Sequence, residues 1–238
     1  MKNKVKQAYD RLSVRYEHED EKYNVYNNYY ERPAMIKQLP DNLKGLKVLD
    51  AGSAAGWYTE YLINQGAIPT AIDISPEMVA ATKRRTKEKA EVLCWDLAEK
   101  LPFKDNTFDI IISSLTLHYL KDWDNTFFEF SRVLKPNGIF LYSVHHPIMD
   151  ISISETKKYL ETELLTDHWK YGNEKIEVVF YRRPLHQIIN TTLKSFYLEE
   201  LIEPSPREEL KKKMPDSYYQ LLQRPNFLIV KSINSKKK

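Results

Sequence analysis

The sequence predicts an α/β protein built on a mainly parallel, seven-stranded sheet with helices on both faces. Short apolar runs alternate with helical segments of about 10–15 residues, which is the pattern of parallel strands joined by helical crossovers. The run Ile110–Ile112 is apolar without alternation, as expected for a strand covered on both sides. With 238 residues, 42% of them hydrophobic and 29% charged, the chain is long enough to bury such a sheet in one domain.

The expected strands are short apolar or alternating runs, five of them before residue 145 and two near the C-terminal end. They comprise residues 47–51, 67–73, 91–94, 108–113, 139–144, 196–202 and 227–231. Helical spacing predicts the helices between them, at residues 57–65, from residue 76 onward, at 123–134 and at 185–194.

Several helix ends carry clear end signals. Gly66 follows the first crossover helix and predicts its C-cap. Ser75 predicts the N-cap of the next helix, with Pro76 in the first turn and Glu77 at the positive end of the helix dipole. A turn over 135–138 is expected to close the helix at 123–134.

We expect one domain with four parts. Residues 1–45 form a tyrosine-rich helical cap, 46–147 form the ligand-binding core, 148–180 form an insertion on the open side of the core, and 181–238 complete the sheet. The insertion is interpreted as a lid over the site, with a surface excursion of no functional role as the alternative.

Within the insertion, two segments have a recognisable pattern. Residues 155–165 have helix-like spacing, and residues 175–181 alternate as an added strand would.

The composition limits the classes of protein that need consideration. A single cysteine, Cys94, excludes an internal disulfide framework and a multi-cysteine metal site, and no metal is expected. The residues after Met1 lack the apolar stretch of a secretory signal, and no run approaches the roughly 18 apolar residues of a membrane span, so a cytoplasmic protein without a membrane partner is expected. The net charge of +3 is small and part of it lies in Lys236–Lys238, which does not favour nucleic acid as a partner.

A small-residue turn follows the first strand and carries the first chemical signal. Gly52 and Gly56 bracket it, but they lack the G-x-G-x-x-G spacing of a dinucleotide site. Asp50 lies two residues before the first glycine, where a carboxylate would repel a diphosphate and attract an ammonium group. The turn therefore favours a cationic nucleoside without phosphate over NAD.

Two more acids end the next two strands. Asp73 lies about 20 residues beyond the turn, where a carboxylate accepts from both hydroxyls of a ribose. Asp96 follows the third strand, where it is placed to accept from an exocyclic adenine amine beside the apolar Trp95 and Leu97. Either acid alone would be an ordinary cap or turn residue, but together with Asp50 they predict a nucleoside site at one rim of the sheet.

These motifs resemble those of the class I S-adenosylmethionine (SAM)-dependent methyltransferases, and more narrowly the small-molecule branch with a UbiE-like core. The segments that carry the resemblance are Asp50–Gly56, Ala71–Ser75 with Met78, Asp96–Leu97, Phe108–Asp109 and Leu134–Gly138. The resemblance is strong over residues 45–145 and weaker over 26–34 and 185–231. It implies a Rossmann-like fold, SAM as the cofactor and a small-molecule methyl acceptor.

The resemblance also implies roles for residues around the cofactor. Asp50 would support the amino group of SAM, Asp73 its ribose, and Asp96 with Leu97 the far edge of its adenine. The remaining residues implied at the cofactor are Gly52, Ser53, Ala54 and Gly56 at the methionine end, Ile74, Ser75 and Met78 at the adenine, and Ser113, Ser114 and Leu115 beside the methyl group. Ala54 departs from the glycine that the family often has, and its extra methyl group is expected to lower affinity.

Three histidines follow strands at the same rim and are the candidate general bases. His145 and His146 follow the fifth strand, and His118 follows the fourth. For His118 a packing or capping role is the favoured alternative; for the adjacent pair, one member bonding only to backbone is equally compatible. In the N-terminal cap, Tyr16, Tyr29 and Arg32 are candidates for contact with the ligand or for closing the site, against the alternative that the aromatic rings only cover the sheet.

Methyl transfer to a small molecule is the leading interpretation among four. A nucleic-acid methyltransferase is disfavoured because Ser113–Leu117 lacks the Asn/Asp-Pro-Pro-aromatic run of base-amine enzymes, and Cys94 lacks the neighbouring proline of cytosine-C5 enzymes. A nucleotide oxidoreductase is disfavoured by Asp50 and the glycine spacing. A non-catalytic SAM-binding protein stays open, and the sequence specifies neither the acceptor atom nor the oligomeric state.

Overall fold

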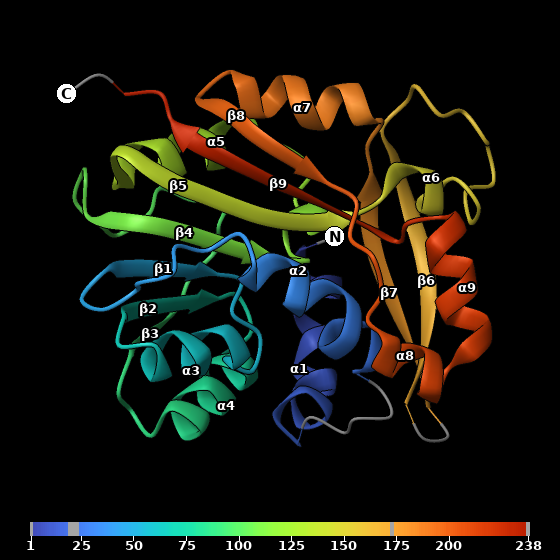
Figure 1. Ribbon diagram of the computed structural model, residues 1–238, viewed down its shortest axis with the longest axis horizontal. Coiled ribbons are helices and arrows are strands. Elements are labelled where there is room, and N and C mark those ends of the chain that lie inside the picture. Colours follow the sequence, from blue (N-terminus) through green and yellow to red (C-terminus); the bar gives the residue numbers. More distant parts are fainter. Residues whose placement is uncertain (1, 19–23, 172–173, 237–238) are drawn as a thin grey trace.

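The fold is dominated by a seven-stranded sheet with the strand order β3-β2-β1-β4-β5-β9-β8 (Figure 1). The computed structural model describes residues 2–18, 24–171 and 174–236; Tyr23 of the cap and the last two lysines lie outside this part. The strands are β1 Lys47–Ala51, β2 Ile68–Asp73, β3 Glu91–Cys94, β4 Phe108–Ser114, β5 Leu134–His145, β8 Phe196–Ile202 and β9 Phe227–Asn234.

The first five strands are parallel, and β9 lies antiparallel between β5 and β8. The chain order reverses between β1 and β4, and such a reversal opens a crevice beyond the carboxyl ends of the strands. The predicted Rossmann-like, mainly parallel sheet is confirmed.

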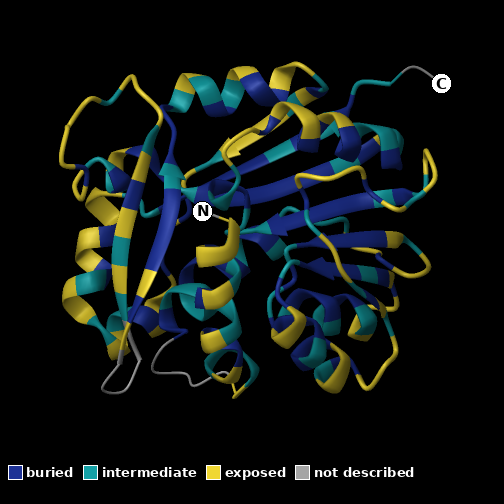
Figure 2. Cartoon of the chain, turned by 180° about the vertical axis from the view of Figure 1, so that it is seen from behind, coloured by how far each residue is buried: buried dark blue, intermediate teal, exposed yellow. Residues whose placement is uncertain are grey.

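Helices cover both faces of this sheet. α3 (Trp57–Asn64) and α4 (Pro76–Thr86) pack on one face, and α5 (Asp124–Val133) and α7 (Leu185–Leu193) pack on the other. Alternate residues of each central strand face the two layers, so Val48 contacts the α3 side and Leu49 the α5 side. Figure 2 shows the central strands buried and the outer faces of the helices exposed.

The predicted end signals of α4 are present in the structure. The Ser75 hydroxyl accepts a hydrogen bond from the backbone N–H of Met78 at 3.1 Å, and Pro76 occupies the first helical position. This cap fixes the start of α4 directly after β2, and therefore holds the end of β2 at the crevice.

The N-terminal cap is helical, as predicted, over three elements. They are α1 (Lys2–His18), a π-helical turn η1 (Asn27–Glu31) and α2 (Arg32–Ile36). Residues 37–46 form turns that lead into β1.

The insertion differs from its predicted structure. The helix expected over 155–165 is wrong, because residues 151–162 form turns and β6 (Glu163–Tyr171) follows, paired antiparallel with β7 (Glu174–Arg182). The expected strand is real, but it belongs to this separate two-stranded sheet. The buried Arg182 donates hydrogen bonds to the carbonyl groups of Lys158, Tyr159 and Glu161, which holds these carbonyls away from helical partners.

Two other parts of the chain differ from expectation. The turn predicted over 135–138 is the start of β5, where several residues lie opposite a single residue of β4 and form a bulge near Asn137, whose φ is +60°. The sequence reading also missed three short helices, α6 (Pro147–Asp150), α8 (Glu208–Lys213) and α9 (Pro215–Gln223), two of which begin with a proline at the first helical position.

The elements outside the main sheet gather at the carboxyl ends of its parallel strands. In Figure 1, the strands β1, β2 and β4 point toward α1, α2, β6, β7, α8 and α9. Side chains of α1 and of the β6–β7 hairpin share one apolar cluster that includes Leu12, Leu165, Ile176 and Phe180. The cap and the insertion therefore form one layer over the crevice. Among the described residues, no helix combines the length and apolarity needed to cross a membrane.

Candidate functional site

A cavity of about 840 Å³ lies between the carboxyl ends of the strands and this covering layer. Its walls come from the first turn of the sheet, from α1, η1 and α2, and from the β6–β7 hairpin. A volume of this size is within the range of small-molecule and cofactor sites, about 300–1,000 Å³.

The small-residue turn forms one end of the cavity. Gly52 has a φ of +84°, and a β-carbon at this position would overlap the side chain of Thr116. The backbone N–H groups of Gly52 and Ser53 both donate to the carbonyl of Ile72. These contacts hold the turn tightly against β2, so a ligand can approach its backbone closely. Gly52, Ser53 and Ala54 line the cavity.

Asp50 is buried at the end of β1 and also lines the cavity. The Thr59 hydroxyl donates to its carboxylate at 2.6 Å. Burial raises the pKa of Asp50 to about 7, against the opposing hydrogen bond from Thr59, and the nearby Asp73 adds to the rise. A cationic ligand group would offset this penalty because it stabilises the ionised form.

Asp73 lies across the turn from Asp50. One carboxylate oxygen accepts from the backbone N–H of Ala54, and the other accepts from that of Ser75, both at 2.9 Å. Burial raises the pKa of Asp73 to about 6, against these backbone hydrogen bonds. The two hydrogen bonds fix the carboxylate at the cavity wall, and each oxygen keeps a lone pair for a ligand hydroxyl.

Asp96 completes the group of three carboxylates. It lines the cavity beside Ile74 and Leu97, and its carboxylate forms an ion pair of 2.5 Å with Lys2 of α1. The three acids predicted from the sequence therefore lie around one cavity, and the first turn of α1 closes over the third of them.

Four other predicted residues support the cavity without lining it. Gly56 begins α3 with a φ of +78°, Ser75 caps α4, and Met78 packs beneath α1 in the cluster with Leu12. The Ser113 hydroxyl donates to the carbonyl of Ala51 at 2.8 Å.

Ser114, the last residue of β4, and Leu115, which follows it, do line the cavity, next to Thr116. The φ of Leu115 is +47°, which turns the chain sharply away from β4 at the cavity. The cavity therefore continues past the end of β4 toward the histidines.

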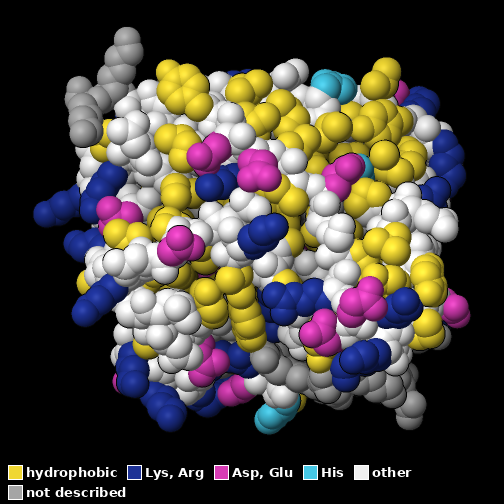
Figure 3. Space-filling view, in the orientation of Figure 1, with side chains coloured by type: hydrophobic (Ala, Val, Ile, Leu, Met, Phe, Trp, Pro, Cys, Tyr) yellow, Lys and Arg dark blue, Asp and Glu magenta, His cyan; other side chains and the backbone are white. Residues whose placement is uncertain are grey.

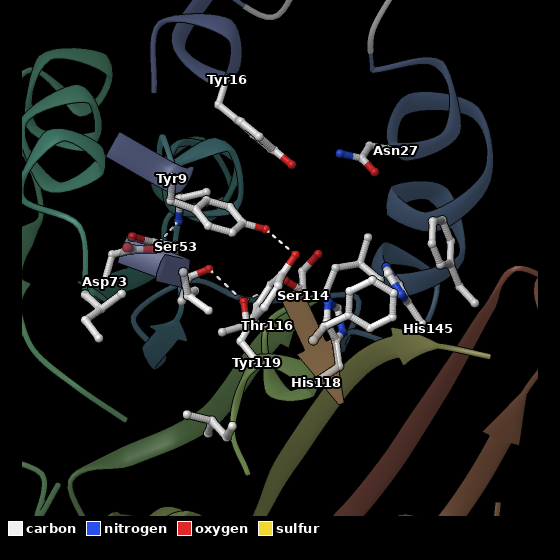
Figure 4. A pocket seen from close by; sticks show the side chains of 18 of the residues that line it. Tyr9, Tyr16, Asn27, Ser53, Asp73, Ser114, Thr116, His118, Tyr119 and His145 are labelled. Carbon is white, nitrogen blue, oxygen red and sulfur yellow. Dashed lines mark hydrogen bonds between the residues drawn. The ribbon is translucent and has the colours of Figure 1, made fainter. Parts of the chain in front are cut away.

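The three candidate histidines have different surroundings. The rings of His118 and His145 stack at 4.1 Å and both line the cavity (Figure 4). Neither ring nitrogen of His118 has a hydrogen-bond partner among the residues that the structure describes. Burial lowers the pKa of His118 well below the usual value, and His145 adds to this effect.

His146 points elsewhere. Its Nδ1 accepts from the backbone N–H of Ile148 at the start of α6, and its Nε2 lies 3.0 Å from the carboxylate of Glu203. It does not line the cavity, so the structure gives it a capping role.

The N-terminal cap contributes a buried acid that the sequence analysis did not identify. The Glu31 carboxylate accepts from the hydroxyls of Tyr58, Ser114 and Ser143, at 2.9, 2.8 and 2.6 Å. Burial raises the pKa of Glu31, against these three hydrogen bonds. Glu31 therefore joins the cap to α3, β4 and β5; its only sequence signal is its place in the segment 26–34 of weaker resemblance.

Arg32, predicted to face the site, lines the cavity with its guanidinium 4.1 Å from the ring centre of Trp57. Trp57 opens α3 directly after the small-residue turn, so this cation lies at the turn end of the cavity. Tyr16 lines the cavity as predicted, together with Tyr9, whose hydroxyl donates to that of Tyr119 at 2.7 Å.

Tyr29, in contrast, does not line the cavity. It packs in the apolar cluster of α8 and α9, with the Lys213 ammonium group 5.6 Å from its ring centre.

The charges around the turn fit SAM better than a dinucleotide. SAM carries a sulfonium, an ammonium and a carboxylate, and the cavity offers the acids Asp50 and Asp73 together with the cation Arg32. A diphosphate beside two buried carboxylates would be repelled. Within the described ranges, no group of three or more His, Cys, Asp or Glu is placed to hold a metal ion.

Comparisons with known proteins agree with this geometry. A family described as a methyltransferase domain matches residues 49–142. A biotin biosynthesis bifunctional protein from Cellvibrio japonicus is 35% identical over 104 residues, which are 44% of this chain and 20% of that protein. A demethylmenaquinone methyltransferase from Tropheryma whipplei is 32% identical over 149 residues, which are 62% of this chain and 59% of that protein.

The chain thus spans less than two thirds of the length of either relative. A solved structure gives a longer match. A protein from Listeria monocytogenes, assigned to the SAM-dependent methyltransferases, superposes with a TM-score of 0.74 at 26% identity, covering 87% of this chain and 97% of that one.

Proposed function

Since the chain belongs to the class I SAM-dependent methyltransferases, we propose that it transfers the methyl group of SAM to a small-molecule acceptor bound in the same cavity. The observation that carries the proposal is the convergence of Asp50, Asp73 and Asp96 on one tight turn, in a cavity that continues past β4 to a pair of histidines.

In this proposal the residues at the turn hold the cofactor by its charges and hydroxyls. Asp50 faces the ammonium group, Arg32 the carboxylate, Asp73 the ribose, and Asp96 with Leu97 the adenine. Bound SAM supplies an electrophilic methyl group on its sulfonium, and the protein contributes binding, orientation and exclusion of water.

The covering layer positions the acceptor. Aromatic side chains of α1 and the β6–β7 hairpin, among them Tyr9, Tyr16, Trp169 and Phe180, line the cavity beyond the turn. Holding two reactants in line contributes about 7–11 kcal/mol in favourable intramolecular cases. The lid role of residues 148–180 is part of this proposal, and its support is the shared apolar cluster of the hairpin and α1.

His145 is the proposed general base where the acceptor arrives protonated. It lines the cavity with a partly exposed side chain, whereas both nitrogens of His118 are buried and His146 is engaged at α6. A general base contributes about 10²–10⁴-fold to the rate.

A small molecule is favoured over nucleic acid as the acceptor because the cap and the hairpin cover the cavity. Figure 3 shows acidic and basic side chains interspersed on the face that it displays, without a basic stripe. A cytoplasmic location belongs to the same proposal and is supported by the single, exposed thiol of Cys94.

The test combines SAM binding with methyl transfer. Isothermal titration calorimetry should show that Asp73→Ala weakens SAM binding by roughly 1–3 kcal/mol, the range for leaving ligand hydroxyls unpaired in a closed site. Asp41→Asn removes an exposed acid from the turns that precede β1, outside the cavity wall, and serves as the matched control. Labelled-methyl transfer from SAM into fractionated cell extract reports activity and isolates the acceptor.

Each outcome separates the alternatives. Binding of NADH in place of SAM would contradict the proposal and favour an oxidoreductase. Tight SAM binding without transfer to any fraction would favour a non-catalytic SAM-binding protein. Transfer into RNA, with steeply salt-dependent binding, would favour a nucleic-acid acceptor.

A further inference from the structure

A buried aspartate, Asp150, lies directly behind the proposed base. Its carboxylate oxygen Oδ1 is 3.3 Å from Nδ1 of His145, and its side chain is 6% exposed. Asp150 comes from α6, the short helix that begins the insertion, whereas His145 ends β5. Asp150 reaches His145 because the chain turns back at His146 and Pro147, between β5 and α6.

The His145 ring is also held on its faces and edges. His118 stacks against one face at 4.1 Å with 24° between the planes, and Phe227 lies nearly parallel at 6.1 Å. Phe180 of β7 meets the ring edge-on at 4.6 Å. These contacts leave the ring little freedom to turn, so the carboxylate that lies beside Nδ1 favours the tautomer with its proton on that nitrogen.

We propose that Asp150 is a positioning residue that keeps the proton of His145 on Nδ1, so that Nε2 accepts a proton from a flat-ring acceptor bearing a neutral O–H or N–H group. This inference rests on the proposed methyl transfer and names its substrate class.

The surroundings of the pair favour that class of acceptor. Phe180, which contacts the His145 ring, and Trp169 of the same hairpin both line the cavity and offer flat apolar walls. Asp150 and Asp167 line the cavity as well, together with the cations Arg15 and Lys121; Asp150 is the charge beside His145, and its carboxylate repels an acceptor that is already an anion. A carboxylate acceptor would also have no proton for His145 to remove.

The reaction balances with these groups alone. The acceptor oxygen or nitrogen forms a bond to the methyl carbon as the carbon–sulfur bond breaks, and that bonding pair stays on sulfur to give S-adenosylhomocysteine. The acceptor proton passes to Nε2 of His145. Asp150 stabilises the resulting imidazolium, which returns its proton to solvent.

The first test needs no acceptor. Long-range ¹H–¹⁵N correlation spectra of the full chain should show His145 protonated on Nδ1 and unprotonated on Nε2. Asp150→Asn should move the population toward the opposite tautomer, since an amide in place of the carboxylate can donate to Nδ1. An unchanged tautomer in Asp150→Asn would overturn the proposal. Asp124→Asn, which alters an exposed ion pair with Lys194, is the matched control.

The second test uses the extract fraction that accepts labelled methyl. Asp150→Asn should lower kcat about 100-fold or more, within the range for general-base catalysis, with SAM affinity and melting temperature within error of wild type. Asp150→Glu retains a carboxylate and should recover part of the rate. A loss confined to KM would contradict a role in orienting the base.

The pH–rate profiles of the wild type and of Asp150→Asn give a further test, because they should not differ if Asp150 only packs against His145. Among the described residues, His145 pairs with Asp150 from α6 and stacks on His118 from η2 (Leu117–Tyr119). Arg183 acts on His118, and Tyr119 and His146 act on Asp150, while Phe180 and Phe227 carry no charge. Removing the carboxylate destabilises the protonated ring, so the rising limb should move to lower pH. A limb that stays in place would argue against the assignment.

The acceptor class is tested with defined ring compounds. In the presence of S-adenosylhomocysteine, phenol should shift the His145 resonances at millimolar concentration, and benzoate should shift them at least about tenfold more weakly. Stronger binding of benzoate would overturn the substrate class. If SAM fails to bind at all while the tautomer result holds, the proposed function fails separately from the His145–Asp150 pair.

Discussion

Replacing Asp50 by asparagine should stabilise the ligand-free protein at neutral pH and weaken its binding of SAM. The carboxylate is buried, and burial raises its pKa from 3.8 to about 7. A difference of about 3 pKa units corresponds to roughly 4 kcal/mol at 1.36 kcal/mol per unit. The asparagine amide has its own desolvation cost and forms a weaker hydrogen bond with Thr59, so we expect a net gain of about 1–3 kcal/mol.

The pH dependence of this gain has a definite sign. A carboxyl group whose folded-state pKa is raised stabilises the fold most at low pH, and this contribution is lost as the pH rises from about 4 to about 7. The variant has no such group at position 50. Its advantage over the wild type should therefore be absent near pH 3, grow between pH 4 and 7, and stay constant above pH 8.

Urea unfolding of both proteins at several pH values, with and without SAM, measures these quantities. Saturating SAM should stabilise the wild type more than Asp50→Asn, because the cationic ligand pairs with the ionised carboxylate. Asp41→Asn controls for a general effect of removing an acid. A variant that is less stable than the wild type at pH 8, by the same amount at every pH, would refute the reasoning.

Three further substitutions test the other parts of the site. Gly52→Ala places a methyl group against Thr116 at a φ of +84°. It should therefore lower the free energy of unfolding in urea by about 1–3 kcal/mol and abolish SAM binding in calorimetry. Wild-type affinity for SAM would show that the backbone of the turn can shift to accommodate the methyl group. Glu31→Ala leaves three buried hydroxyls without their acceptor, so it should lower the free energy of unfolding by about 1–3 kcal/mol, with Glu31→Gln intermediate; equal stability of both would contradict the anchoring role. His145→Ala should reduce turnover about 10²–10⁴-fold in the labelled-methyl assay while sparing SAM affinity, and an unaffected rate would remove it as the base.

The end of the cavity formed by the small-residue turn was predictable, because the features that form it depend on residues close together in the sequence and on the parallel sheet. Asp50, Asp73 and Asp96 each follow an apolar run, and parallel strands bring their carboxyl ends to one edge of the sheet. The cap of α4 was equally visible, since Ser75 and Pro76 act within one turn of the helix. These features depend on neighbours in the sequence and on the sheet alone.

The layer that covers the cavity was not predictable, because its contacts join distant segments of the chain. The Glu31 carboxylate accepts hydrogen bonds from residues 27, 83 and 112 positions away in the sequence, and no sequence pattern predicts such a cluster. The spacing over residues 155–165 resembles a helix, but Arg182 binds the carbonyls of this segment from more than 20 residues away. Asp150 has no sequence signal, because its importance depends on a turn of the chain at Pro147.

The two ends of the cavity differ in their charged groups. This difference fits a reaction that begins with the sulfonium cation of SAM and ends with the neutral sulfur of S-adenosylhomocysteine. At the turn, Asp50 and Asp73 are held buried with raised pKa values, so the ligand-free protein bears a cost that a positive ligand relieves. Past β4, burial lowers the pKa of His118 and keeps its ring neutral, and the side chain of Asp150 lies 3.3 Å from Nδ1 of His145. In the proposed mechanism, a proton taken up by His145 lies next to the carboxyl group of Asp150, while loss of the sulfonium charge removes the attraction at the turn. Binding should accordingly be tighter for SAM than for S-adenosylhomocysteine, with the difference decreasing as the pH falls through about 7 and about 6 and Asp50 and then Asp73 become protonated.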